Sequence, residues 1–167
     1  TAITGSASDV TDVLAVETSQ GNAGQQIDLD TDFTVTVTDT GSVAATTLTT
    51  LDSGVPGTVT ATTVDTLTGT AAEVAAAVSA GGLTLDGDFT VTLTDNSTAA
   101  ASDLKTINTA TTGIITATGV TAISGSISDI NDVLAVETSQ GNAGQQIDLD
   151  TDFTVTVTDT GSVAATT

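Results

Sequence analysis

Residues 1–47 return almost unchanged as residues 121–167, so the chain carries an internal repeat with a period of 120 residues. Only four of the paired positions differ, namely Thr4/Ser124, Ala7/Ile127, Val10/Ile130 and Thr11/Asn131. Repetition at a fixed period is typical of architectures in which each unit packs on its neighbours. The sequence therefore predicts one full period, residues 1–120, and the start of a near-identical second one, residues 121–167, in one continuous body without separate domains.

A shorter repeat lies within the period, because the chain matches itself again at about half of that spacing. Residues 27–39, for example, align with residues 83–95. The two sub-repeats are residues 1–64 and 65–120, and they differ mainly by one insertion, residues 17–26. Each sub-repeat divides into two passes of strand, turn and short helical turn. The four predicted passes are residues 32–57, 58–87, 88–113 and 114–151.

Alternation with a period of two predicts the strands. From Ile27 to Val37 the odd positions are mostly apolar, and the even positions are aspartate or threonine. A half-buried strand needs one apolar and one polar face, and β-branched residues suit its pleated surface. This segment is expected to form one half-buried strand, and shorter strands are expected at residues 59–61 and 115–117. A change of phase near Val64, and again near Val120, indicates a corner.

Short helical turns are expected between the strands. Thr70 and Ser126 are each followed three residues later by an acid, which is the spacing of a capping box at the start of a helix. Apolar residues then recur at helical spacing. Leu48 and Leu51, like the equivalent pair in the second sub-repeat, support only about one turn of helix. The helical segments are therefore predicted to be short and to lie on one side of each pass.

These patterns predict a mainly β fold, a parallel β-solenoid of about four coils per 120-residue period with short helical turns on one side. One such coil cannot bury its apolar face alone, so stacking is expected to stabilise it. The alternative fold is a series of tandem small β-sandwich repeats, each about 60 residues long, since short alternating strands at regular spacing are also typical of sandwiches.

The charge of the chain excludes several classes of function. It has 21 acidic residues and one basic residue, Lys105, for a net charge of −20. Recognition of nucleic acid needs a basic footprint, and an anionic membrane surface would repel this chain. No stretch approaches the roughly 18 apolar residues of a membrane-spanning helix. We expect no nucleic-acid partner, no membrane insertion, and a pairing of Lys105 with Asp103 or a neighbouring acid.

Catalysis is not expected, because the chain contains neither histidine nor cysteine. It therefore lacks the commonest general base and the thiol nucleophile. Its serines and aspartates recur at equivalent places of the repeat, which is typical of a structural role. The absence of cysteine also excludes a disulfide framework and a thiolate metal site. The sequence predicts a protein that is not an enzyme and that has no organic cofactor.

Alternating aspartates are the one candidate metal site, because carboxylate oxygens are the ligands that Ca²⁺ prefers. Phenylalanine stands where an EF-hand loop needs glycine, so this is not an EF-hand. On the solvated face of an extended strand, alternate carboxylates lie about 7 Å apart, too far to share one ion. Two interpretations stay open, a calcium site and a row of solvated acids. The candidate ligands are Asp28, Asp30 and Asp32 in the first copy and Asp148, Asp150 and Asp152 in the second.

Threonines recur on the polar face of every predicted strand, and strands about 4.8 Å apart would stack them into a regular grid. Such grids resemble the surfaces of ice-binding proteins, which makes ice binding a less favoured alternative function. Threonine columns also pair across strands in proteins with no such ligand. The threonines are Thr34, Thr36 and Thr38, Thr58, Thr60 and Thr62, Thr90, Thr92 and Thr94, and Thr116 and Thr118.

Residues 101–118, with the sequence ASDLKTINTATTGIITAT, and residues 123–130, ISGSISDI, carry a resemblance to a known group of proteins. They are similar to the repeat arrays of very large cyanobacterial cell-surface proteins. The resemblance implies an extracellular, structural, adhesive or motility-linked role and supplies no catalytic residues. The expected function is a structural repeat segment of an extracellular filament, sheath or adhesin stalk that assembles with itself by stacking. The alternative is an adhesin spacer made rigid by Ca²⁺.

Overall fold

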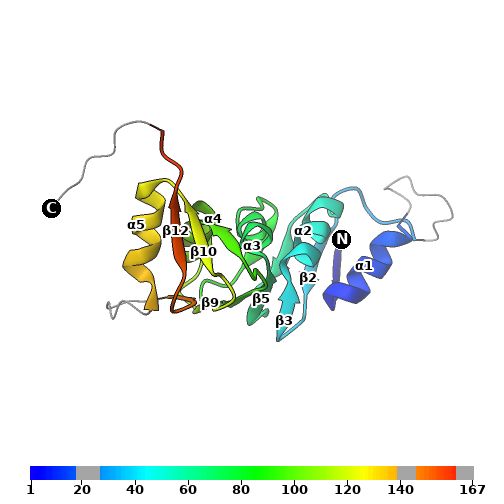
Figure 1. The fold of residues 1–167 in the computed structure, drawn as a ribbon. Helices are drawn as coiled ribbons and strands as arrows, with labels where there is room; N and C mark the ends of the chain where they lie inside the picture. Colours follow the sequence, from blue (N-terminus) through cyan, green and yellow to red (C-terminus); the bar gives the residue numbers. More distant parts are fainter. Residues whose placement is uncertain (18–26, 139–145, 161–167) are drawn as a thin grey trace.

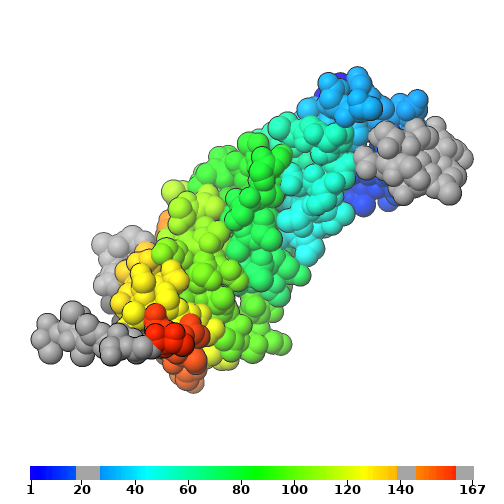
Figure 2. Space-filling model, turned by 90° about the horizontal axis from the view of Figure 1, so that it is seen from above, coloured from blue at the N-terminus to red at the C-terminus, as the bar shows by residue number. Residues whose placement is uncertain are grey.

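The computed structural model describes residues 1–17, 27–138 and 146–160, which form an elongated body with α1 and α5 near its opposite ends (Figures 1 and 2). In chain order the elements are β1 (Ala2–Gly5), α1 (Ala7–Ala15), β2 (Thr34–Val37), β3 (Ser42–Ala44), α2 (Ala45–Gly54), β4 (Val59–Ala61), β5 (Thr66–Gly69), α3 (Ala71–Val78), β6 (Leu83–Leu85), β7 (Thr90–Leu93), β8 (Thr98–Ala100), α4 (Ala101–Ala110), β9 (Ile115–Ala117), β10 (Ala122–Gly125), α5 (Ile127–Val136), β11 (Ile147–Leu149) and β12 (Thr154–Val157).

The strands pair in parallel in three sheets, with the orders β1-β2-β4-β6, β3-β5-β7-β9-β11 and β8-β10-β12. Val35 of β2 pairs with Val59 of β4, and Ile3 of β1 pairs with Val35 of β2. The insertion lies between Ile3 and Val35, so more residues of chain separate these two partners than separate Val35 from Val59. Residues 18–26, the rest of the insertion after Glu17, lie outside the described residues. We call one pass of the chain through the sheets, with its helix, a unit. Each sheet grows by adding the corresponding strand of the next unit, and β10 continues its sheet across the boundary between the two periods.

The predicted fold class is wrong. The described part of the chain is 33% helical and 31% strand, an α/β protein rather than a mainly β one. The five helices have eight to ten residues each, and each contacts the next in a row from α1 to α5 (Figure 1). Closure of the strands into a solenoid is not shown. The β-sandwich alternative is wrong as well, because sandwich sheets are antiparallel and every strand pair among the described residues is parallel.

Tertiary packing explains why the helices α2 and α4 exceed the single turn that the sequence predicts. Neither has a side-chain hydrogen bond at its N-cap, and threonine is a poor helix former. Leu48 and Leu51 of α2 are fully buried, however, as are Leu104 and Ile107 of α4. Burial of such side chains contributes about 1.5–3 kcal/mol each, more than the few tenths that each threonine costs. Packing on the neighbouring units therefore sets the length of these helices.

The predicted strand from Ile27 to Val37 is divided by a turn. In the second copy, the equivalent residues form two separate strands, β11 and β12, which belong to different sheets. The division falls at the aspartates, and the N–H of Phe33 donates to the carbonyl of Asp30 across the turn, at 3.3 Å. Aspartate favours turns because its side chain bonds nearby backbone groups. The predicted faces are correct beyond the turn, where Val35 and Val37 are buried and Thr36 is exposed.

Candidate functional site

The structure does not gather the predicted calcium ligands. Asp28, Asp30 and Asp32 are all exposed, and Asp32 lies in the turn before β2. In the second copy Asp148 and Asp150 are half-buried and Asp152 is exposed, and the hydroxyl of Thr138 donates to Asp148 Oδ1 at 3.0 Å. Within residues 1–17, 27–138 and 146–160, no three acidic side chains are placed to hold a metal ion.

Chelation tests the calcium prediction directly. Because the structure does not bring these aspartates together, we expect the melting temperature to be the same in excess EDTA as in Ca²⁺. A Ca²⁺ concentration of about 5 mM is enough to saturate even weak extracellular sites. Circular dichroism would follow the transition. A melting temperature raised by Ca²⁺, and returned to its starting value by EDTA, would establish the ion as a structural ligand.

Side-chain caps begin three of the five helices in the described part of the chain, two of them at the predicted positions. The hydroxyl oxygen of Thr70 accepts the N–H of Glu73, and the Glu73 carboxylate accepts the N–H of Thr70, which completes the predicted capping box. At residue 126 the serine half of the box forms, since Ser126 accepts the N–H of Asp129, whose carboxylate accepts the serine hydroxyl. Ser6 and Asp9 repeat this arrangement in α1. The acids near these helix starts also interact favourably with the helix dipole.

A second carboxylate reaches the start of each of these helices from the next unit. Asp39 Oδ2 accepts the N–H of Ala7 at 2.7 Å, across 32 residues of chain. Asp95 Oδ2 accepts the N–H of Ala71 at 2.6 Å, across 24 residues, and Asp159 makes the equivalent bond to α5 at 2.7 Å. The first turn of a helix has N–H groups without partners in the helix, and these bonds satisfy one of them. The acids following the strands therefore link neighbouring units.

These carboxylates were not predicted from the sequence. Their signal was visible, because an aspartate follows the Thr-x-Thr of residues 36–38, 92–94 and 156–158. The hydrogen bond between each aspartate and a helix N–H could not be predicted from the spacing alone, however. It depends on which helix begins beside the end of each strand. Knowledge of the strand register supplies what the sequence lacks.

Removal of one link should weaken the stack at that place. Asp95→Ala leaves the N–H of Ala71 without its acceptor, and we expect a loss of about 0.5–2 kcal/mol in the free energy of unfolding. Asp95→Asn keeps an oxygen acceptor at the same place and should lose less. Urea denaturation of the two variants measures both effects. Equal losses would show that the negative charge, rather than the hydrogen bond, is what matters.

Lys105 of α4 pairs across the row with α5, not with Asp103. Its Nζ lies 2.9 Å from Asp129 Oδ1 and 2.8 Å from Asp132 Oδ2. The hydrogen bonds to Asp132 and Asp129 hold the pKa of Lys105 well above its usual value. The bond from Lys105, followed by that from Ser126, lowers the pKa of Asp129. The one base of the chain thus joins two units.

The contribution of this ion pair should depend on pH. Because the pKa of Asp129 is lowered on folding, its share is present above its ordinary value of 3.8 and is lost as the pH falls through the folded value. Because the pKa of Lys105 is raised, its share is present below 10.5 and is lost as the pH rises through the folded value. We expect Lys105→Thr to melt lower than wild type at pH 7, with the difference closing below about pH 3 and in about 1 M salt.

Two glutamates, Glu17 and Glu137, are fully buried, and their burial was not predicted from the sequence. Glu17 and Glu137 occupy equivalent places, each the first residue of an insertion, and they form isolated parallel bridges to Ile27 and Ile147 respectively. Glu17 Oε1 accepts the N–H of Leu29 at 3.1 Å. A buried carboxylate is stable only where it is hydrogen-bonded. No local pattern indicates this burial, since the preceding Val16 is itself 39% exposed.

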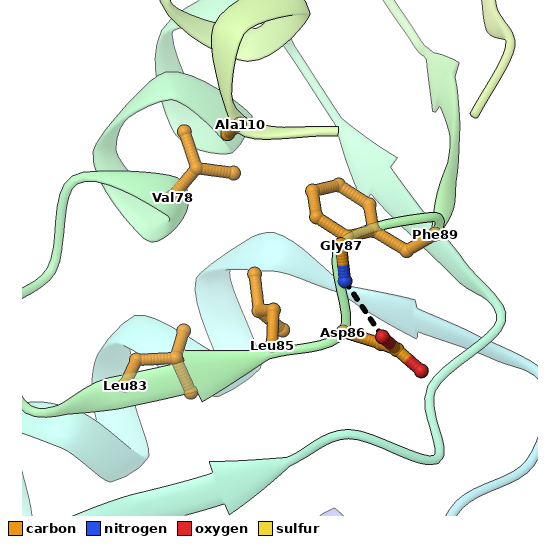
Figure 3. A pocket seen from close by; sticks show the side chains of 7 residues that line it. All are labelled: Val78, Leu83, Leu85, Asp86, Gly87, Phe89 and Ala110. Atoms are coloured by element: carbon orange, nitrogen blue, oxygen red, sulfur yellow. Dashed lines mark hydrogen bonds between the residues drawn. The ribbon is translucent and has the colours of Figure 1, made fainter. Parts of the chain in front are cut away.

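An apolar pocket of about 270 Å³ lies where α3, β6 and α4 meet (Figure 3). Figure 3 shows the side chains of Val78, Leu85 and Phe89 around it. Its one charged lining residue is Asp86, which is exposed and accepts the N–H of Gly87 at 2.7 Å. An apolar pocket with a single solvated carboxylate has neither a paired acid and base nor an activated nucleophile. Its lining offers no catalytic arrangement.

The threonines stack as predicted, but in two sheets rather than in one grid. Thr36 pairs with Thr60 in the sheet of β2 and β4, whereas Thr92 pairs with Thr116 in the sheet of β7 and β9. Thr36 and Thr92 are equivalent in the sequence repeat, yet β2 and β7 belong to different sheets. The predicted threonines are therefore divided between two surfaces.

Comparisons with protein-family models, with curated proteins and with solved structures found no match. Among the described residues, no helix has the length and apolar character needed to cross a membrane.

Proposed function

We propose that this chain is a structural repeat segment of an extracellular filament, sheath or adhesin stalk, built by stacking units of its own kind. One observation carries the proposal. Residues 32–40 and 152–160 have the same sequence. Val35 and Val37 are 1% exposed where β4 of the next unit lies beside β2, but Val155 and Val157 are 44% and 46% exposed in β12, beside which no such strand is described.

The stacked unit therefore supplies the burial that a single unit lacks. Parallel strand pairs and helix contacts recur from unit to unit, and carboxylates bond the starts of α1, α3 and α5 in the preceding unit. Nothing in this arrangement limits the number of units, which suits a mechanical role. The acidic surface favours a rod that stays in solution, and the partner in assembly is the chain itself.

Melting of tandem arrays tests the proposal. Chains with one, two and three copies of residues 1–120 should melt at progressively higher temperatures, because each copy adds a stabilising interface between neighbours. Calorimetry should also show one cooperative transition in each array. Equal melting temperatures in all arrays would mean that the copies fold as independent beads, which contradicts assembly by stacking.

A further inference from the structure

The first strand and helix of the chain recur inside it, where their surroundings can be compared. Residues 1–17 match residues 121–137 except at four positions, so β1 and α1 correspond to β10 and α5. β10 pairs with β12 on one edge and with β8 on the other. β1 pairs with β2, and no described strand pairs with its other edge. Ile123 of β10 is fully buried, whereas the equivalent Ile3 is only half-buried.

Acidic side chains also lie on the helix α1, beside β1. In α5, Asp129 and Asp132 hold Lys105 of the preceding helix between them. The equivalent acids of α1 are Asp9 and Asp12, and both are exposed at the end of the helix row (Figure 1). Lys105 is the one base of the chain. The face made by β1 and α1 thus has a strand edge with no described partner beside two carboxylates, in the arrangement that binds β8 and α4 elsewhere in this protein.

We propose that the face formed by β1 and α1 docks a second copy of the β8–α4 segment, residues 98–110, with its lysine between Asp9 and Asp12. The proposal rests on assembly by stacking and specifies its register. The other half of the period has Thr49 at the place of Lys105, and α3 has Ala76 at the place of Asp132. A slip by half a period would therefore leave Asp9 and Asp12 facing a threonine. The single lysine of each period selects the correct neighbour, since the loss of a charge pair disfavours the wrong one.

The test uses the full chain with a short extension. Residue 121 is equivalent to residue 1, so a copy of residues 97–120 placed directly before Thr1 continues the pattern without a linker and includes Ser97, whose carbonyl accepts the N–H of Ala122 inside the chain. The matched control is an extension with residues 41–64, the half-period equivalent, which carries threonine in place of the lysine. A third chain replaces that lysine by threonine in the first extension.

Hydrogen exchange and the resonance signals of the carboxyl groups give the readouts. Inside the chain, the N–H of Ala122 donates to the carbonyl of Ser97 at 3.1 Å, so docking should slow exchange of the equivalent Ala2 amide at least about tenfold. Nuclear magnetic resonance should also show the side-chain carboxyl signals of Asp9 and Asp12 moving in the first extension, because Lys105 lies 2.9 Å and 2.8 Å from the equivalent Asp129 and Asp132. The control and the threonine variant should leave these carboxyl signals where they are in the unextended chain.

Two results would overturn the proposal: Ala2 exchanging as fast as in the unextended chain, or the two extensions having equal effects on Ala2 and Asp9. Because every readout comes from a single chain, this test does not depend on the formation of fibres. If the extension docks but the copies in tandem arrays melt independently, the proposed register is correct and the proposed function is wrong.

Discussion

Leu104→Ala is expected to lower the free energy of unfolding by about 2–5 kcal/mol, the cost of opening a cavity in a packed core. Leu104 is fully buried in α4, which contacts both α3 and α5. A loss of this size is a large part of the roughly 5–15 kcal/mol that stabilises typical domains. Because α4 lies within the row of helices, we expect the whole stack to weaken, as measured by urea denaturation monitored by circular dichroism.

The matched control lies just beyond α4. Ile114 is 47% exposed, and Ile114→Ala should change the free energy of unfolding by less than about 0.5 kcal/mol. Losses of similar size in both variants would show that α4 does not pack as described. Leu48 is the equivalent of Leu104 in α2 and is also fully buried, so Leu48→Ala should reproduce the larger loss.

Gly113→Ala should also destabilise the protein, with an expected loss of about 1–3 kcal/mol in the free energy of unfolding from overpacking. A β-carbon at Gly113 would overlap the carbonyl oxygen of Phe89 and lie 2.7 Å from that of Asp88. Both are backbone atoms of the preceding unit and cannot move aside as a flexible side chain would. The hydroxyl of Thr111, itself buried, donates to the same Phe89 carbonyl and fixes the two segments together.

Gly87→Ala provides the control, because a β-carbon there would meet no atom within 4 Å. Its backbone is compatible with alanine, so we expect a gain of about 0.4–1 kcal/mol from the reduced freedom of the unfolded chain. Opposite signs for the two glycines, measured by thermal denaturation, would confirm the close approach of units at Gly113. A neutral Gly113→Ala would mean that these two segments are further apart.

Local features of the structure could be predicted from the sequence, because they depend on neighbouring residues. Val35 and Val37 face the core as their alternation predicts, and Thr70 and Ser126 begin helices as their spacing to an acid predicts. The turn near Val64 also lies where the change of phase places it.

Features that depend on contacts between units could not be predicted in this way. The length of α2 comes from the burial of Leu48 and Leu51 against neighbouring helices, which outweighs the weak helix propensity of its threonines. The division of the predicted strand at the aspartates places its two halves, β11 and β12 in the second copy, in different sheets. The bond from Ala71 to Asp95 requires the register in which the strands pair, which the spacing of the sequence repeats does not contain.

The length of tandem arrays in solution tests the central claim, that these units stack into one rod. Small-angle X-ray scattering on chains with one, two, three and four copies of residues 1–120 would give the maximum dimension and the cross-section of each. We predict that each added copy lengthens the particle by the same amount, at least four strand spacings or about 19 Å, while the radius of the cross-section stays constant. A dimension that grows with roughly the 0.6 power of chain length, as in an unfolded chain, or a cross-section that widens with each copy, would contradict the account.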